Sequence, residues 1–254
     1  MKITLLGTGT SQGVPVIGCD CDVCTSPDPR DHRLRCSLWV SDGETSVVID
    51  AGPDFRQQML RSNVPKIDAL FLTHEHNDHV AGMDDVRPFN FKQGGELPVY
   101  ALPRVLKVIK LRYSYAFGPE PYAGAPRFEL RPCAAGTAIT VGSLHFQPLD
   151  IWHGELPILG FRVRNMAYLT DVKTLPPATL AALQNLDVLI INALHYNPHP
   201  THLNLDEALE LISVLQPKRA YLTHCSHRIG KYADVQPQLP PNVFLGYDEF
   251  SNEL

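Results

Sequence analysis

Short apolar runs separated by polar and turn residues dominate this sequence. They predict strands in the first half of the chain at residues 2–6, 38–40, 46–49, 67–72 and 98–102. In the second half they predict strands at 138–141, 144–149, 158–163, 167–169, 188–191 and 219–222. Apolar residues at helical spacing predict helices at 55–62, 104–113, 178–183 and 205–215. This alternation indicates an α/β protein, and we expect one domain over residues 1–254, because 44% hydrophobic content can fill a core of that size.

The most informative stretch is T-H-E-H-N-D-H at residues 73–79, directly after a predicted strand. It places four potential metal ligands within six positions: His74, His76, Asp78 and His79. Imidazoles and carboxylates suit Zn, Mn and Fe, and three His with one Asp exceed what one tetrahedral ion takes from a single loop. We therefore expect two metal ions at this loop.

The H-x-H-x-D-H motif resembles the signature of the metallo-β-lactamase-fold hydrolases. That resemblance implies a four-layer αββα sandwich in which three later strand ends supply further metal ligands, in the order His, Asp, His. The chain offers one candidate for each, and each follows a predicted strand: His153, Asp171 and His224. The resemblance covers nearly the whole chain.

By analogy with that family, the seven residues divide into two metal sites bridged by Asp171. The first site would contain His74, His76 and His153. The second would contain Asp78, His79 and His224, and Asp78 is also counted as catalytic. Two ions about 3.5–4 Å apart can share one hydroxide, because they lower the pKa of bound water toward about 7. The expected cofactors of this site are two divalent ions, Mn or Zn, between which ligand type alone does not choose.

A second cluster of ligands lies near the start of the chain. Cys19, Cys21 and Cys24 form C-x-C-x-x-C, and three thiolates in six residues predict a structural Zn closed by one remote ligand. We favour His227 for that fourth position, with Cys225 and Cys36 as alternatives. Free, reduced cysteines are the competing interpretation. Cys133 is expected to be a thiol of the hydrophobic core.

Together, the two clusters resemble the phosphodiesterases that accompany the carbon–phosphorus lyase pathway of phosphonate degradation. The resemblance includes G-T-G-T-S-Q-G-V-P at 7–15, D-A-G at 50–52 and T-H-C-S-H at 223–227. It implies general acid–base catalysis by His202, because a His with a pKa near ~6.5 can protonate an alkoxide leaving group. The alternative is that His202 caps the following helix or only binds phosphate. His195 and His199 are expected to be loop or wall residues.

Two further segments carry weaker expectations. Residues 84–127 are rich in aromatics, and within them we expect Arg87 to contact the substrate. Gly7, Gly9 and Gly13 match neither the dinucleotide fingerprint nor the P-loop. We expect these glycines instead to allow a close backbone approach beneath the metal loop.

The leading functional hypothesis is a metal-dependent phosphodiesterase that hydrolyses small or cyclic phosphodiesters with the bridging hydroxide. A tRNA 3′-processing endonuclease shares the metal motif, but a net charge of −5 argues against a nucleic-acid footprint. A lactonase or thioesterase on the same fold is a further alternative, because the hydroxide can also attack carbon. A binding protein without enzymatic activity is disfavoured by the complete ligand set.

The remaining expectations concern location and assembly. No apolar run approaches the ~18 residues that span a membrane, so we expect no membrane association. No signal peptide is visible after Met1, and we expect a cytoplasmic protein whose thiols stay reduced. The expected partner is a small-molecule phosphodiester, with nucleic acid disfavoured, and the resemblance implies a homodimer.

Overall fold

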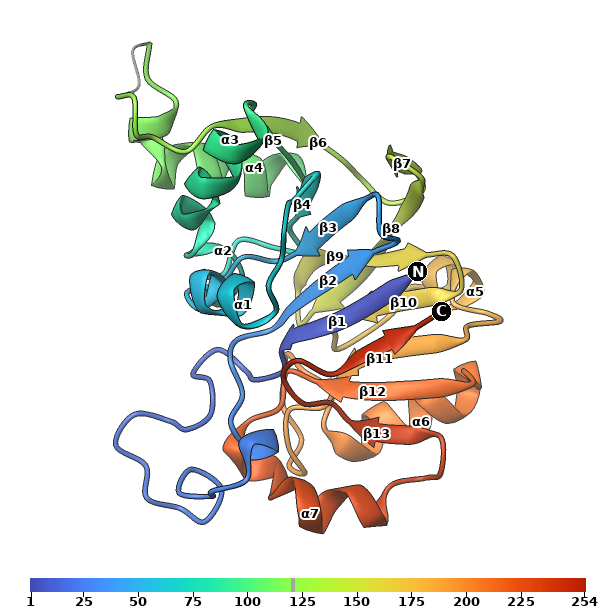
Figure 1. Ribbon diagram of the computed structural model, residues 1–254. Helices are drawn as coiled ribbons and strands as arrows, with labels where there is room; N and C mark the ends of the chain where they lie inside the picture. Colours follow the sequence, from blue (N-terminus) through green and yellow to red (C-terminus); the bar gives the residue numbers. More distant parts are fainter. Residues whose placement is uncertain (120–121) are drawn as a thin grey trace.

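The computed structural model describes residues 1–119 and 122–254 and consists of two seven-stranded sheets packed face to face, with helices on both outer faces (Figure 1). The first half of the chain forms the first sheet, and only its last short strand comes from the C-terminus. In spatial order the first sheet contains β14 (Ser251–Glu253), β1 (Lys2–Gly7), β2 (Ser37–Ser41), β3 (Ser46–Ile49), β4 (Ala69–Phe71), β5 (Leu97–Ala101) and β6 (Phe128–Pro132).

The second sheet is formed by the second half of the chain. Its spatial order is β13 (Val243–Leu245), β12 (Arg219–Thr223), β11 (Val188–Asn192), β10 (Met166–Leu169), β9 (Leu156–Val163), β8 (Leu144–His153) and β7 (Ile139–Val141). Strands β10 to β13 are parallel. Strands β3 to β6 of the first sheet are parallel as well. Loops at the carboxyl ends of parallel strands gather at one edge of a sheet, so this topology brings residues of several loops together there.

The helices cover the outer faces of the two sheets (Figure 1). On the first sheet lie α1 (Phe55–Arg61), α2 (Asn77–Val80), α3 (Arg87–Gln93) and α4 (Pro103–Arg112). On the second lie α5 (Pro177–Ala182), α6 (Leu205–Leu215) and α7 (Tyr232–Val235). Short 3₁₀ turns occur at Pro29–Asp31, Met83–Val86, Ser114–Ala116, His227–Ile229 and Gln236–Gln238.

Three hydrophobic clusters fill the spaces between the four layers. The central cluster lies between the sheets, where Phe71 stacks on Tyr100 and Phe146 at ring-centroid distances of 4.9 and 4.6 Å. A second cluster joins α1 and α4 to the outer face of the first sheet. The third joins α6 to the outer face of the second sheet. The fold is therefore the expected αββα sandwich, and that prediction is confirmed.

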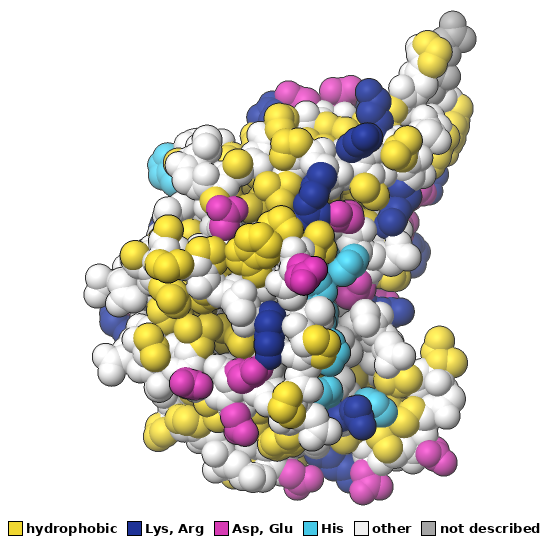
Figure 2. All heavy atoms as spheres, turned by 180° about the vertical axis from the view of Figure 1, so that it is seen from behind, with side chains coloured by type: hydrophobic (Ala, Val, Ile, Leu, Met, Phe, Trp, Pro, Cys, Tyr) yellow, Lys and Arg dark blue, Asp and Glu magenta, His cyan; other side chains and the backbone are white. Residues whose placement is uncertain are grey.

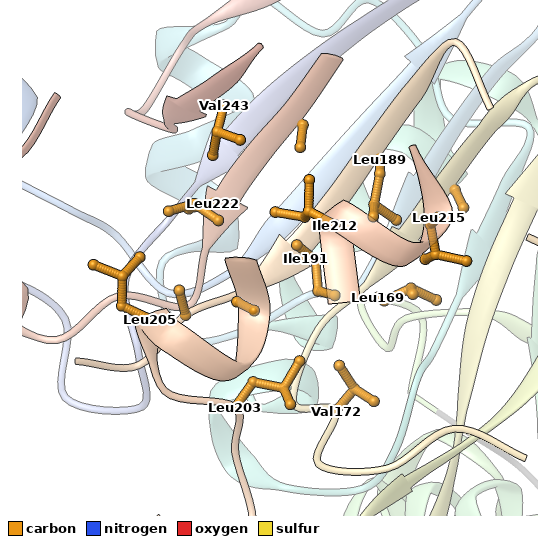
Figure 3. Packing of buried hydrophobic residues seen from close by; sticks show 14 of the residues in the cluster. Leu169, Val172, Leu189, Ile191, Leu203, Leu205, Ile212, Leu215, Leu222 and Val243 are labelled. Carbon is orange, nitrogen blue, oxygen red and sulfur yellow. The ribbon is translucent and has the colours of Figure 1, made fainter. Parts of the chain in front are cut away.

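Helix α6 shows how the sequence specifies one of these layers. Asn204 accepts a hydrogen bond from the Glu207 amide at 2.8 Å while the Glu207 side chain accepts one from the Asn204 amide, which is a capping box. The helix then places Leu205, Ile212 and Leu215 on one face. Figure 3 shows these side chains packed toward Leu222, Ile191 and Leu169 of the sheet.

The predicted elements agree with the structure at most positions, with specific errors. Strand β8 runs on to His153, which is its last residue, instead of ending at position 149. Strands β6, β13 and β14 and helices α2, α3 and α7 had not been predicted. Residues 120 and 121 of the aromatic segment lie outside the described residues. In the described part of the chain, no helix has both the length and the apolar character needed to cross a membrane.

Replacing Ile212 by Ala tests the packing of α6. Ile212 is 4% exposed, whereas Val214 on the same helix is 64% exposed. Removing the buried side chain should destabilise the protein by roughly 2–5 kcal/mol, because it leaves a cavity against the sheet. Val214→Ala should change the free energy of unfolding by no more than about 0.5 kcal/mol. Equal denaturant midpoints for the two variants would show that α6 does not depend on this contact.

Candidate metal centre

The seven predicted ligands come from four strand ends that meet at one edge of the sandwich. The loop after β4 carries the H-x-H-x-D-H motif, and α2 begins within it at Asn77. From the second sheet, His153 ends β8, Asp171 follows β10 and His224 follows β12. Figure 2 shows histidine side chains gathered along one face of the molecule, with acidic side chains beside them. The sheets thus bring residues from both halves of the chain to one place.

The first group of potential ligands contains His74, His76 and His153, one ligand atom of each lying within 4.8 Å of the others. His74 Nε2 and His76 Nδ1 are 2.9 Å apart. His153 Nδ1 donates to the carbonyl oxygens of Asp171 and Thr201, at 3.0 and 2.9 Å. Because Nδ1 carries the proton in this arrangement, Nε2 of His153 keeps a free lone pair for a metal.

The second group contains Asp78, His79, Asp171 and His224, again with ligand atoms within 4.8 Å of one another. His79 Nε2 is buried and makes no hydrogen bond, although one carboxylate oxygen of Asp78 and one of Asp171 each lie 3.2 Å away. His224 Nδ1 lies 3.2 Å from the same Asp171 oxygen. Donor atoms that converge without bonding one another fit a cation between them, and we take this as the test of fit for metal binding.

The electrostatics of this centre favour positive charge. Burial raises the cost of ionising Asp171, but His224 and His79 outweigh it and hold the pKa of Asp171 well below its usual range. Burial likewise opposes a charged His79, yet Asp171 and Asp50 raise its pKa well above the usual value. A buried cluster with several ionised carboxylates is costly unless a cation neutralises it, which a divalent ion does.

Asp50 also belongs to the candidate site, although the sequence indicated it only as part of a motif. It is fully buried at the end of β3, and its carboxylate lies 2.7 Å from His79 Nδ1. It also accepts hydrogen bonds from the amide and the hydroxyl of Thr73. A carboxylate behind a ligating imidazole fixes its orientation and raises its basicity. The D-A-G sequence at the strand end was the available signal.

Three residues at strand ends adopt the left-handed conformation that non-glycine residues rarely occupy. The φ angles are +65° at Asp50, +58° at Asp171 and +53° at His224. Such conformations cost energy and persist where the surrounding contacts require them. Here they turn each polar side chain out of its strand and into the cluster.

Two glycines allow the metal loop to approach the first sheet. A Cβ at Gly52 would lie 2.0 Å from the Asp78 carbonyl oxygen, and one at Gly82 would lie 2.0 Å from the Gly52 carbonyl oxygen. The close approach beneath the metal loop is therefore made by Gly52 and Gly82. Gly7, Gly9 and Gly13, which had been expected there, approach the backbone of residues 33–35 instead, so that expectation was wrong.

The early cysteines gather with His227 as a separate group. Nδ1 of His227 lies 3.4, 3.3 and 3.5 Å from the sulfurs of Cys19, Cys21 and Cys24. A hydrogen bond from the Cys24 amide, followed by His227, lowers the pKa of Cys21 to about 6, which favours the thiolate that binds metals. This S₃N donor set fits tetrahedral Zn.

The two alternative fourth ligands lie elsewhere. Cys225 and Cys36 are buried and each contacts Thr223, Cys225 at its carbonyl oxygen and Cys36 at its hydroxyl. Neither belongs to the group around Cys21. Cys133 is buried in the central hydrophobic cluster, where a core thiol was expected.

His202 lies at the edge of the metal cluster. Its Nδ1 is 3.7 Å from an oxygen of Asp171, and its ring centroid is 4.6 Å from that of His153. Burial, and then His224, lower the pKa of His202 to about 3, so the imidazole is neutral near pH 7 in the free protein. Arg87 is not brought into this group: it pairs with Asp84 and its Nη1 lies 3.5 Å from the Tyr122 hydroxyl.

The αββα sandwich with converging imidazoles and carboxylates at one edge is the architecture of a metal-dependent hydrolase. The family model described as "Beta-lactamase superfamily domain" matches residues 45–225, and the chain belongs to this superfamily. The structure also resembles a crystal structure described as a new diphosphatase from the PhnP family, with a TM-score of 0.93 and 40% identity. That match covers 100% of this chain and 97% of the other.

Two further relatives show how widely this architecture is used. The octanoyltransferase of Porphyromonas gingivalis is 40% identical over 250 residues, which are 98% of this chain and 50% of that protein. The chain thus spans half the length of this curated relative. The Zn²⁺-bound PqqB of Methylobacterium extorquens is 18% identical, covers all of both chains and has a TM-score of 0.82, which shows a shared fold.

Removal of His227 tests the cysteine-rich site. His227→Ala should lose one equivalent of Zn, measured by elemental analysis, because the three sulfurs would lack their fourth partner. Cys225→Ser serves as the control, since Cys225 is just two residues away but outside the group, and it should keep its full Zn content. Loss of Zn from the Cys225 variant alone would reverse this assignment.

Proposed function

We propose that the protein is a phosphodiesterase acting on small or cyclic phosphodiesters, with two divalent ions held by the seven residues around Asp171. The observation that carries the proposal is the unbonded Nε2 of His79, buried between two carboxylates at 3.2 Å. The 40% identity with a diphosphatase across almost all of both chains supports a phosphorus substrate. We also propose that the cysteine-rich group holds a structural Zn.

In this proposal, His74, His76 and His153 would hold one ion and Asp78, His79 and His224 the other, with Asp171 shared between them. Two divalent ions, when bound, supply a nucleophilic water at neutral pH and positive charge for the phosphoryl oxygens. Mn and Zn both suit these donors.

The protein's own residues supply orientation and hydrogen bonds. Asp50 keeps His79 in one orientation, and the carbonyl oxygens of Asp171 and Thr201 do the same for His153. His202 Nδ1 is buried without a partner beside the cluster, so its ring is available to a bound phosphate. An anionic phosphate raises the pKa of a neighbouring imidazole, which would let His202 give a proton to the leaving oxygen.

The relative described as a diphosphatase acts on a different phosphorus bond from that of an alkyl diester. A diphosphate linkage releases a phosphate, which leaves without protonation, whereas an alkyl diester releases an alkoxide that needs a proton. The diphosphate linkage is a phosphoanhydride and lies outside the proposed class of phosphodiesters, although attack on phosphorus is common to both reactions. Octanoyl transfer is not part of the proposal, because this chain corresponds to only half of that relative. The groups of potential metal ligands fit a hydrolase.

A substrate panel tests the proposed function. Protein loaded with Mn should hydrolyse bis(p-nitrophenyl) phosphate and a 2′,3′-cyclic nucleotide much faster than p-nitrophenyl phosphate or a lactone. Asp171→Ala should lower diester turnover by about 10²-fold or more, because the second group loses its central carboxylate, which also lies within 4.8 Å of a ligand atom of His153. His145→Ala is the control, since His145 is exposed and contacts Thr140. Lactone hydrolysis alone would refute the phosphodiester assignment, and salt-sensitive tRNA cleavage would favour the nuclease.

The leaving group tests the role of His202. His202→Gln should slow an alkyl diester by roughly 10²–10⁴-fold and an activated aryl diester far less, because p-nitrophenolate leaves without a proton. Both rates are measured at saturating substrate, so that the kcat for the alkyl diester is compared with the kcat for the aryl diester. Equal losses on the two substrates would assign His202 to phosphate binding.

A further inference from the structure

The loop between β11 and α6 carries a row of three imidazoles that ends at the metal cluster. Ring centroids are 6.1 Å apart for His195 and His199 and 5.0 Å apart for His199 and His202. From His202 the row continues to His153 at 4.6 Å and His224 at 4.9 Å. His195 and His199, which had been expected to be loop or wall residues, therefore lie in a row that reaches the centre through His202.

The outer part of this row lacks the geometry of a metal site. Within the described residues, His202 has a ligand atom within 4.8 Å of those of His153 and Asp171. No such group of three or more among these residues includes His195 or His199. The outer imidazoles therefore act through their neighbours.

His199 is linked to the metal ligand His153 through one residue. Nδ1 of His199 lies 3.3 Å from both the amide nitrogen and the hydroxyl of Thr201, and it accepts the amide hydrogen. The carbonyl oxygen of the same Thr201 accepts the Nδ1–H of His153 at 2.9 Å. The position of the Thr201 backbone, and with it the orientation of His153, therefore depends on His199.

The rest of the loop is held firmly enough to transmit this contact. Its two ends are joined by a hydrogen bond from the Leu194 amide to the Leu203 carbonyl at 3.0 Å. Leu203 donates in turn to the Val172 carbonyl at 2.9 Å, next to Asp171. The Leu205 amide bonds the His195 carbonyl at 2.9 Å, which ties the loop to the start of α6. The segment between these bonds is thus short.

We propose that His199 is a positioning residue with two separate actions: its Nδ1 fixes His153 through Thr201, and its ring fixes His202. This inference rests on the proposed metal centre and on the proposed role of His202. It assigns His199 no metal and no substrate contact.

Two substitutions at position 199 separate these actions. Asn places an amide oxygen near the position of Nδ1 and can accept the Thr201 amide hydrogen, but it has no ring to contact His202. Ala removes both. His199→Ala should weaken metal binding to the apoprotein by about 10–100-fold, the usual cost of losing a group that orients a ligand. His199→Asn should bind metal like the wild type.

The activity measurement completes the design. Both variants should lose more kcat on an alkyl diester than on an aryl diester, because both leave His202 without the contact of the His199 ring. Metal affinity is measured by chelator competition, and the thermal unfolding of each apoprotein shows whether it folds. His145→Ala is the matched exposed control and should change neither quantity. If the Ala variant does not fold, the Asn variant alone still tests the ring contact through the alkyl-to-aryl ratio.

Unchanged metal affinity in folded His199→Ala would overturn the action on His153. An unchanged alkyl-to-aryl ratio in His199→Asn would overturn the action on His202. Weakened metal binding in the Asn variant, equal to that of Ala, would also contradict the proposal, because Asn keeps the acceptor. If the wild type binds metal but hydrolyses no diester, the proposed function fails while the affinity measurement still tests the action on His153.

Discussion

The carboxylate of Asp171 is the group on which the rest of the site depends. One of its oxygens lies 3.2 Å from both His79 and His224 and accepts the Thr170 hydroxyl at 2.6 Å. Its backbone carbonyl accepts the hydrogen of His153. A buried carboxylate this close to two imidazoles is stable only because they, or a bound cation, offset its charge. Asp171 therefore joins ligands of the first sheet to ligands of the second.

This arrangement requires the two sheets to keep a fixed separation. His79 lies on α2, after β4 of the first sheet, and His224 follows β12 of the second sheet, so a change in the distance between the sheets would separate them. Phe71 is the last residue of β4, three residues before His74. Its ring packs against Phe146 and Phe161 of the second sheet, and these contacts set the distance between the sheets. Close packing makes such a contact resist compression. The hydrophobic core thus determines the geometry of the metal ligands.

The sequence predicted the parts of the structure that repeat a local pattern. Apolar runs of four or more residues predicted most strands, and α6 was predicted at its observed bounds from its helical apolar spacing. Strands β13 and β14 have three residues each, too few to show a period. Helix α2 was missed because it has only four residues, too few to show helical spacing, and two of them are the predicted ligands Asp78 and His79.

The residues that orient the ligands were harder to predict than the ligands. Clustered His and Asp residues indicate a metal site because of their residue types. Thr201 instead orients His153 through its backbone carbonyl, which any residue possesses. Thr10 is a second residue that contacts a predicted ligand without being one, since its hydroxyl lies 3.1 Å from His224 Nε2. The cysteine loop that follows Thr10 contacts His227. Backbone bonds between residues 8–10 and Cys225 hold the two segments together. A Zn in the cysteine group would therefore stabilise the loop that presents His224, although the two groups share no predicted ligand.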